Sequence, residues 1–563
     1  RGAAIRIESY MPLRFLPITR DEVDTLGWDG VDVVIVTGDA YVDHPSFGAA
    51  VIGRVLEAEG YRVAVLAMPP WRTPEAASLF GRPRLFFGVT SGNVDSMLAR
   101  YTAFRKVRND DPYAPGGAAG GRPERAVIVY ANMIRSVYRD VPIVLGGIEA
   151  SMRRFAHYDF WSDRVRRSIM LDSRADILVH GMGEKQIVEI ARRLDAGEGL
   201  SDIPGTVEVR RDLPPAAMVL PPEAEAMKDE HAYARFFRDF YLNQHRVLAQ
   251  ESGKRYIVQH PSPRMEIGDL DAVYALPFAR LPHPSYTDAI PGFATVRTSV
   301  VSHRGCVSGC AFCSLSLHQG RRIVPRSEDS VLEEVALLAR SSGFGGHITD
   351  IGGPSANMYG TSCAADWRCS RQSCLHPEIC PNLRINTASW MRLLGRTLES
   401  PGVRHATVGS GIRYDLFMRD DPSLLECLAG GHVSGQLKIA PEHTSAGVLD
   451  VMRKKPLYGL EDFADAFYAA SRRAGRRQYV IPYLMSCHPG CRMGDMRAMR
   501  ERVLSVFGFI PEQVQAFIPL PLTLSSAIYH TGMDPLTGEK VFVARGDQER
   551  RGQHGVFHKK GNS

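Results

Sequence analysis

Residues 303–313 read HRGCVSGCAFC, and their three cysteines are separated by three and then by two residues. Thiolates at these spacings can converge on one side of a short loop. Because a cubane iron-sulfur cluster is normally held by four cysteine thiolates, three of them leave one iron open to a ligand that is not protein. We therefore expect Cys306, Cys310 and Cys313 to hold a 4Fe-4S cluster with one open iron.

An open iron is typical of radical S-adenosylmethionine (SAM) enzymes. There SAM binds the iron through its amino and carboxylate groups and is cleaved to the 5′-deoxyadenosyl radical, while the protein orients the cofactor and excludes side reactions. Phe312, an aromatic residue just before the third cysteine, is also typical of radical SAM loops. The alternatives are a structural zinc site, which usually closes with four ligands, and free thiols.

The composition is that of an ordinary globular protein, with 44% hydrophobic and 23% charged residues among 563. The length favours two main domains, and the absence of a run of 18 apolar residues predicts that no segment spans a membrane. The net charge of +6 comes from scattered Lys and Arg, which permits nucleic-acid binding without arguing for it. Ten clustered cysteines indicate metal ligation in a reducing compartment, so we expect a cytoplasmic protein.

The first part of the chain alternates short apolar runs with helical patterns, which predicts a Rossmann-like domain over residues 1–200. The expected strands are 31–37, 62–67, 85–89, 126–130, 142–145 and 176–179. Such a doubly wound parallel sheet binds ligands at the carboxyl ends of its strands. Glycine-rich loops follow several of these strands, but no GxGxxG follows the first, so the dinucleotide fingerprint is absent.

This layout is similar to the cobalamin-binding domains that precede some radical SAM cores. Residues 43–48 read DHPSFG, however, and do not match the DxHxxG loop whose histidine ligates cobalt. Two interpretations stay open: a cobalamin-binding domain that lacks this histidine, and a substrate or scaffold domain without cobalamin.

Residues 201–290 are rich in proline and polar residues at first and predict a bridging segment. Residues 291–525 predict a partial (β/α) TIM-type barrel, with the cysteine loop after its first strand at the active face. The expected barrel strands are 295–301, 347–351, 405–408, 436–440, 478–482 and 513–518, with a helix over 327–340 that is capped by Ser327. Residues 526–563 form a C-terminal tail.

Several motifs carry a resemblance to a known family. Residues 352–354 (GGP) resemble the GGE-type motif whose backbone holds the SAM amino group, and residues 437–443 (LKIAPEH) resemble the fourth barrel strand of methylthiotransferase-like radical SAM proteins. With residues 36–48 and 146–151, these motifs make the chain similar to the YgiQ-type radical SAM proteins, whose reaction is unassigned. The resemblance implies a SAM site at Gly352 and Gly353.

Further SAM or substrate contacts are expected from side chains at the ends of later barrel strands, namely Ser410, Arg413 and Glu442. A salt bridge within the barrel is the alternative for Arg413. No residue stands out as the catalytic one.

Residues 361–385 carry a second cysteine group, which consists of Cys363, Cys369, Cys374 and Cys380. Their spacings of five, four and five residues are wider than those of common zinc pairs. An auxiliary iron-sulfur cluster, a zinc ion and a loop of free thiols all stay open.

The sequence thus predicts a radical SAM enzyme that acts on an unidentified substrate, with SAM and a reductant such as flavodoxin or ferredoxin as partners. Within the enzyme class, one alternative is a methylthiotransferase-like or cobalamin-dependent methyltransferase that modifies RNA or protein. From a different class, an iron-sulfur electron carrier or sensor is the other alternative.

Overall fold

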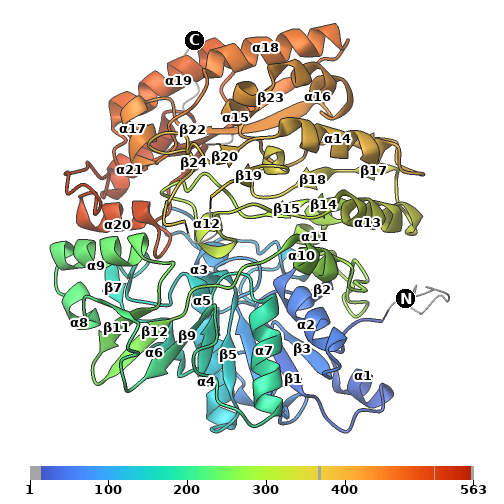
Figure 1. Cartoon of the computed structure of the whole chain (residues 1–563), viewed down its shortest axis with the longest axis vertical. Coiled ribbons are helices and arrows are strands. Elements are labelled where there is room, and N and C mark those ends of the chain that lie inside the picture. The colour runs from blue at the N-terminus through green and yellow to red at the C-terminus, as the bar shows by residue number, and fades with distance from the viewer. Residues whose placement is uncertain (1–13, 366–368, 513, 559–563) are drawn as a thin grey trace.

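The computed structural model describes residues 14–365, 369–512 and 514–558. Figure 1 shows two layers of structure: the N-terminal sheet with its helices, blue to green, and the barrel strands with their helices, yellow to red. The predicted α/β fold, a Rossmann-like domain joined to a partial barrel, is confirmed.

The N-terminal half is organised around one large sheet, which has nine strands within the described residues. Its parallel part runs in the spatial order β3 (Val63–Ala67), β1 (Val33–Thr37), β4 (Phe86–Thr90), β5 (Ile143–Leu145), β8 (Ile177–Val179). Taken in chain order this is 2-1-3-4-5, so the chain reverses direction across the sheet between β1 and β4. Ligands of doubly wound sheets bind at such a reversal point.

Strand β1 explains why the sheet is covered on both faces. All five of its residues are buried. Val33 and Ile35 pack in one hydrophobic cluster with α2 (Gly48–Ala58) and α7 (Glu184–Asp195), whereas Val34 and Val36 pack in another with α4 (Ala126–Val137). Because side chains alternate across a strand, a continuous apolar run is what a doubly covered strand requires.

One predicted strand is wrong: residues 126–130 begin helix α4. Ala126, Val127 and Tyr130 face the core, which is the spacing of a buried helix face. A short apolar run does not by itself distinguish a buried strand from a buried helix, and this helix continues for 12 residues.

The segment expected to act as a bridge adds strands to the edge of the same sheet. Beyond β8 the order continues β9 (Thr206–Arg210), β12 (Arg255–Gln259), β11 (Leu248–Ser252), β10 (Met218–Leu220). Strand β9 runs antiparallel to β8, and β12 is antiparallel to both of its neighbours. Helix α9 (Glu230–Leu242) lies between β10 and β11 in the chain.

The barrel half is a row of parallel strands closed on the outside by helices. The pairs are β14 (Ser299–Val301) with β18 (Asp350–Gly352), β17 (His347–Ile348) with β21 (His405–Ala406), and β22 (Gln436–Glu442) with β23 (Tyr479–Ser486), which also pairs with β24 (Val514–Ala516). A parallel bridge from Ile412 to Ile439 links the third strand to the fourth. The outer helices include α13 (Glu328–Arg340), α14 (Thr387–Leu398), α18 (Leu460–Arg473) and α19 (Met493–Phe507).

The ends of the barrel elements differ in detail from the prediction. The Ser327 hydroxyl accepts a 3.1 Å hydrogen bond from the Ser330 N–H, as expected of the cap of α13. The predicted first strand is shorter, because α11 (Pro291–Val296) begins at a proline suited to the first helical turn. Gln513, which begins the last predicted strand, lies outside the described residues.

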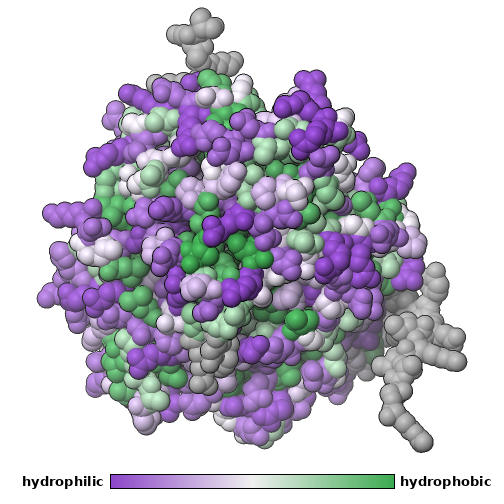
Figure 2. Space-filling model, turned by 45° about the horizontal axis from the view of Figure 1, so that its top comes forward, coloured by the Kyte–Doolittle hydropathy of each residue, from purple (hydrophilic) through white to green (hydrophobic). Residues whose placement is uncertain are grey.

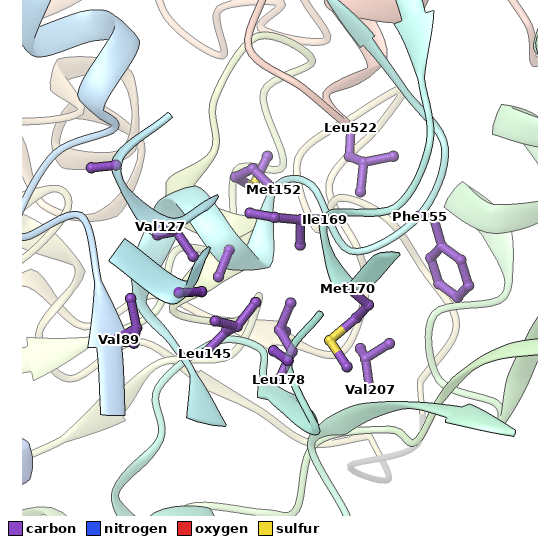
Figure 3. Packing of buried hydrophobic residues seen from close by; sticks show 14 of the residues in the cluster. Val89, Val127, Leu145, Met152, Phe155, Ile169, Met170, Leu178, Val207 and Leu522 are labelled. Atoms are coloured by element: carbon purple, nitrogen blue, oxygen red, sulfur yellow. The ribbon is translucent and has the colours of Figure 1, made fainter. Parts of the chain in front are cut away.

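The two halves share a core. Leu522, from the segment after β24, is fully buried among residues of the N-terminal sheet domain, where Figure 3 shows it near Met152 and Ile169. The guanidinium of Arg550, in α21 (Asp547–Gly555), donates hydrogen bonds to the carbonyl oxygens of Ala103 (3.1 Å) and Phe517 (2.9 Å). The position of the barrel over the sheet is therefore fixed by packing.

The face turned to the viewer in Figure 2 mixes hydrophilic and hydrophobic residues. In the described part of the chain, no helix is both long enough and apolar enough to cross a bilayer.

Candidate active site

The cysteine loop begins at a short hairpin, where β15 (His303–Arg304) pairs with β16 (Val324–Pro325). Gly305 follows with φ +89°, and a Cβ there would lie 1.8 Å from the carbonyl oxygen of Arg322, so only glycine fits. The Cys306 N–H donates to the Gly320 carbonyl (3.1 Å), and the Ala311 N–H donates to the Met452 carbonyl (2.9 Å). The backbone of the loop is thus held at both ends.

The three thiols of this loop lie near one another in a buried setting. Burial raises the pKa of Cys310, and burial with the nearby Cys310 and Cys306 thiols raises the pKa of Cys313 to about 12. Lys454 and Arg413 act against this effect and lower the pKa of Cys310. Two cations therefore lie close to the sulfurs, where they would stabilise thiolates. Three convergent thiols with adjacent positive charge suit a metal cluster.

The spacing of these sulfurs does not suit a single zinc ion. Among the described residues, the ligand atoms of the three cysteines do not all lie within 4.8 Å of one another. Four thiolates on tetrahedral zinc would be about 3.8 Å apart. Thiolates on the corners of a cubane are separated by roughly 6 Å, so sulfurs that are not gathered within 4.8 Å are compatible with the larger group.

Gly352 and Gly353 end β18 and pack tightly on the start of the cysteine loop. A Cβ on Gly353 would lie 2.6 Å from His303 Nε2 and 2.7 Å from the His303 carbonyl, and one on Gly352 would lie 2.7 Å from Ser410 Oγ. Both glycines line the cavity described below. The predicted SAM contact stays a prediction, and close packing is a second reason for glycine here.

Ser410 holds a carboxylate at the same edge. Asp350 Oδ1 accepts hydrogen bonds from the Ser410 hydroxyl (3.0 Å) and from the N–H groups of Gly409 (2.9 Å) and Ser410 (3.0 Å). Burial nevertheless raises the pKa of Asp350, which also lines the cavity. Sequence reasoning missed Asp350, although an acidic residue near the end of the second barrel strand could have indicated it.

Arg413 forms a salt bridge within the barrel, with Asp415, as in the alternative interpretation of this residue. Its Nε and Nη2 bind Asp415 at 2.8 and 2.5 Å, and its Nη1 donates to the Ser308 hydroxyl at 3.1 Å. The Arg413 guanidinium keeps the pKa of the buried Asp415 below its usual value. Arg413 thus braces the cysteine loop, and its predicted contact with SAM or substrate stays a prediction.

Glu442 also reaches the cysteine loop, through a lysine. Its carboxylate lies 2.8 Å from Lys454 Nζ, and that ammonium lies 5.8 Å from the centre of the Phe312 ring. Glu442 itself has φ +65°, an uncommon conformation for a residue with a side chain. The structure therefore brings Arg413, Glu442 and the three cysteines together.

A cavity of about 560 Å³ lies between the two halves. From the N-terminal sheet it is lined by residues at the carboxyl ends of strands, and from the barrel by β14, β18 and the first residues of the cysteine loop. Its lining includes Gly88, Gly146, Gly181, His303 and Gly353. We call this cavity the chamber; it lies where the strand order predicts a ligand.

Polar groups in the chamber come from both halves. Glu184 Oε1 accepts a 2.5 Å hydrogen bond from Arg304, and both side chains are buried. Within the described residues, Glu184 Oε2 and His303 Nε2 are buried without a hydrogen-bond partner. Such atoms are costly unless a ligand or water satisfies them.

Two histidines of the chamber are neutral near pH 7. Burial lowers the pKa of His303 and of His318 to about 4. The His318 Nδ1 and the Ser151 hydroxyl, from the N-terminal half, form a 3.2 Å hydrogen bond. Apart from Asp350, the acidic and basic side chains that line the chamber form one ion pair, and its two imidazoles are neutral.

His44 does not reach the chamber. Its Nδ1 accepts a hydrogen bond from the Ser46 N–H (3.1 Å), and its Nε2 lies 3.2 Å from the Arg280 guanidinium. Burial lowers its pKa well below the usual value. Both ring nitrogens are in use, which agrees with the mismatch of this loop to the cobalt-ligating motif.

The second cysteine group lies directly against the first. Cys363 is in β19 (Ser362–Cys363), which pairs with β20 (Leu383–Arg384). The Cys374 N–H donates to the Val307 carbonyl (3.0 Å), inside the first cysteine loop. No pattern in the sequence predicts this contact.

Comparison with known proteins identifies the relatives of the chain. Residues 15–299 match the family model described as Radical SAM N-terminal, and residues 512–561 match a domain of unknown function (DUF3362). A UPF0313 protein of Geobacter sulfurreducens is 48% identical, over 97% of this chain and 92% of its own length. The chain belongs to the UPF0313 family. This agrees with the resemblance to YgiQ-type radical SAM proteins.

Other UPF0313 proteins match as extensively. The relative in Thermotoga neapolitana is 44% identical over 97% of this UPF0313 chain and 99% of its own length. Among solved structures, the radical SAM methyltransferase TsrM of Kitasatospora setae, with tryptophan substrate and the SAM analogue aza-SAM bound, superposes with a TM-score of 0.50. It is 15% identical, over 87% of this chain and 74% of its own, and so shares the fold.

Proposed function

We propose that this UPF0313 protein is a radical SAM enzyme in which Cys306, Cys310 and Cys313 hold a 4Fe-4S cluster and SAM binds beside Gly352 and Gly353. The observation that carries the proposal is the partly buried loop of three convergent thiols, next to two cations and at the edge of the chamber. When bound, the cluster and SAM supply the electron transfer and the carbon–sulfur cleavage that give a 5′-deoxyadenosyl radical.

The residues of the chain have three tasks in this proposal. Arg413 and Lys454 balance the charge of the thiolates, and Gly352 and Gly353 let the end of β18 approach the start of the loop closely. The chamber encloses the substrate, whose polar groups would meet the unpaired atoms of Glu184. By covering the substrate, the chamber would limit the side reactions of a reactive radical.

The proposal extends to the surroundings of the enzyme. A one-electron donor such as flavodoxin or ferredoxin would reduce the cluster. A cytoplasmic location would keep the ten cysteines, all in the described part of the chain, in the free state in which they are found. RNA or protein is the substrate class suggested by the methylthiotransferase-like motifs of the barrel.

The test uses anaerobically purified protein with SAM and dithionite. Formation of 5′-deoxyadenosine and a reduced-cluster electron paramagnetic resonance (EPR) signal that shifts on adding SAM are expected. Both should be lost in Cys306→Ala, Cys310→Ala and Cys313→Ala and kept in Cys427→Ala, whose thiol is exposed. A SAM-sensitive signal in all three loop variants, or none in the wild type, would contradict the proposal.

A second candidate adds cobalamin to the chamber and makes the protein a cobalamin-dependent methyltransferase. The observation in its favour is the 2-1-3-4-5 strand order with a glycine-lined chamber at the reversal point. No histidine of residues 43–48 would ligate cobalt, so the corrinoid would lack that protein ligand.

Hydroxocobalamin binding, followed by absorbance, tests the second candidate. Gly146 lines the chamber in extended backbone, and a Cβ there meets nothing within 4 Å, so Gly146→Phe would fill the chamber without strain. It should abolish binding, whereas Gly345→Phe, at an equally open exposed glycine, should not. If the wild type cleaves SAM but does not bind hydroxocobalamin, the second candidate is contradicted and the chamber is assigned to the substrate.

A further inference from the structure

The second cysteine group lies on a closed hairpin, in which Cys380 is buried, Cys363 and Cys374 are half-buried and Cys369 is exposed. The stem is the β19–β20 pair, in which Cys363 lies across from Leu383, and the Ala364 N–H adds a 2.9 Å hydrogen bond to the Asn382 carbonyl. Within the hairpin the Cys380 N–H donates to the Cys374 carbonyl at 2.8 Å. The fold therefore brings the two ends and the middle of this cysteine segment together.

This hairpin packs on the first cysteine loop at successive residues. The Cys374 N–H binds the Val307 carbonyl (3.0 Å), and the Ser373 hydroxyl binds the Ser308 carbonyl (2.5 Å). A Cβ on Gly309 would lie 2.2 Å from the Gln372 carbonyl, so the two segments touch closely. Cys306, Cys374 and Cys380 belong to one hydrophobic cluster.

The four thiols of the hairpin interact with each other. The thiols of Cys380, Cys363 and Cys369 lie close enough to Cys374 to raise its pKa, together with burial, to about 11. All four cysteines are free.

A cation, Arg321, lies near this hairpin. Its guanidinium is 5.7 Å from the centre of the Tyr241 ring, and within the described residues it forms no ion pair. Cys374 and Cys369 are the sulfur groups that interact with it electrostatically. Thiolates on a metal group in the hairpin would place negative charge beside this half-buried cation.

The spacing of the sulfurs selects among metal groups. In the part of the chain that the structure describes, no three of the four sulfurs lie within 4.8 Å of one another. The roughly 3.8 Å separation of thiolates on zinc is therefore not formed. A cubane, with four cysteines and no open iron, needs the wider separation.

We propose that Cys363, Cys369, Cys374 and Cys380 ligate a second 4Fe-4S cluster, packed against the loop of the first. With four thiolate ligands it has no site for SAM. This inference does not depend on the first cluster, because its ligands are separate.

Iron, zinc and sulfide analysis with EPR of anaerobic protein tests it. We expect about eight irons per chain in the wild type, and about four, with a SAM-insensitive EPR signal, in the Cys306→Ala, Cys310→Ala, Cys313→Ala triple variant. A Cys374→Ser, Cys380→Ser variant should also retain about four irons, with a SAM-sensitive signal, and Cys427→Ser should retain all eight.

The variants separate the two proposals. The triple variant leaves the hairpin intact, so loss of all iron from it would overturn the second cluster even if the serine variant failed to fold. One zinc per chain in place of the second set of irons would overturn it as well. If the wild type forms no 5′-deoxyadenosine, the proposed function is contradicted, and the proposal of a second cluster is not affected.

Discussion

Replacing Gly353 with alanine should weaken the joint binding of cluster and SAM. The added Cβ would lie 2.7 Å from the His303 carbonyl and 2.6 Å from its ring nitrogen. An ordinary contact begins near 3.4 Å, so His303 must move by about 0.7 Å, and His303 is three residues from Cys306. Overpacking of this size costs about 1–3 kcal/mol.

Where the bound state carries this strain, the combined binding constant of cluster and SAM falls by about 5- to 150-fold, because each 1.4 kcal/mol is about tenfold. Iron content reports the loss of the cluster. The SAM dissociation constant, measured by titrating SAM against the EPR signal of the reduced cluster, reports the loss of SAM binding. Gly345→Ala is the matched control, since its Cβ meets nothing within 4 Å. If Gly353→Ala stays within twofold of this control in both measurements, the packing argument is refuted.

Three further predictions concern the junction of the two halves. Glu184→Ala leaves the buried Arg304 charge unpaired and should lower the free energy of unfolding by about 3–5 kcal/mol, and a double variant with Arg304→Met should recover most of it in a urea double-mutant cycle. The His318 pKa is lowered from 6.5 to about 4, so its contribution to stability is complete above pH 6.5 and falls by up to about 1.4 kcal/mol per pH unit toward pH 4. In urea unfolding between pH 4.5 and 6, His318→Gln should therefore bind about one proton fewer on unfolding than wild type. Leu522→Ala should lower the free energy of unfolding by about 2–5 kcal/mol. Leu522 follows the last barrel strand but packs in the core of the N-terminal half, so the unfolding of that half should shift.

The sequence predicted those elements that are determined by neighbouring residues in the chain. The apolar runs of β1 and β5, the Ser327 cap and the convergence of the loop thiols all follow from residues within a few positions of one another. The strand predicted at 126–130 failed at the same level, because a short apolar run suits two structures equally well.

Contacts between distant segments could not be predicted in this way. Glu184 and Arg304 are 120 residues apart in the chain, and nothing near either one specifies the other. Arg413 was expected to meet a ligand, but Asp415, two residues away, satisfies two of its nitrogens. A single sequence shows which groups need a partner, and only the fold decides whether the partner is protein or ligand.

These contacts give the cysteine loop an unusual number of supports. Arg413 holds Ser308, the hairpin of the second cysteine group holds Val307 and Ser308, and Glu184 holds Arg304 from the other half of the molecule. Each support ends within a few residues of a proposed cluster ligand. Because Glu184 and Arg304 also line the chamber, a ligand that displaces or strengthens their ion pair changes the free energy of the loop itself. Binding in the chamber and binding of SAM are then linked by one free energy, and each must alter the affinity for the other by the same factor.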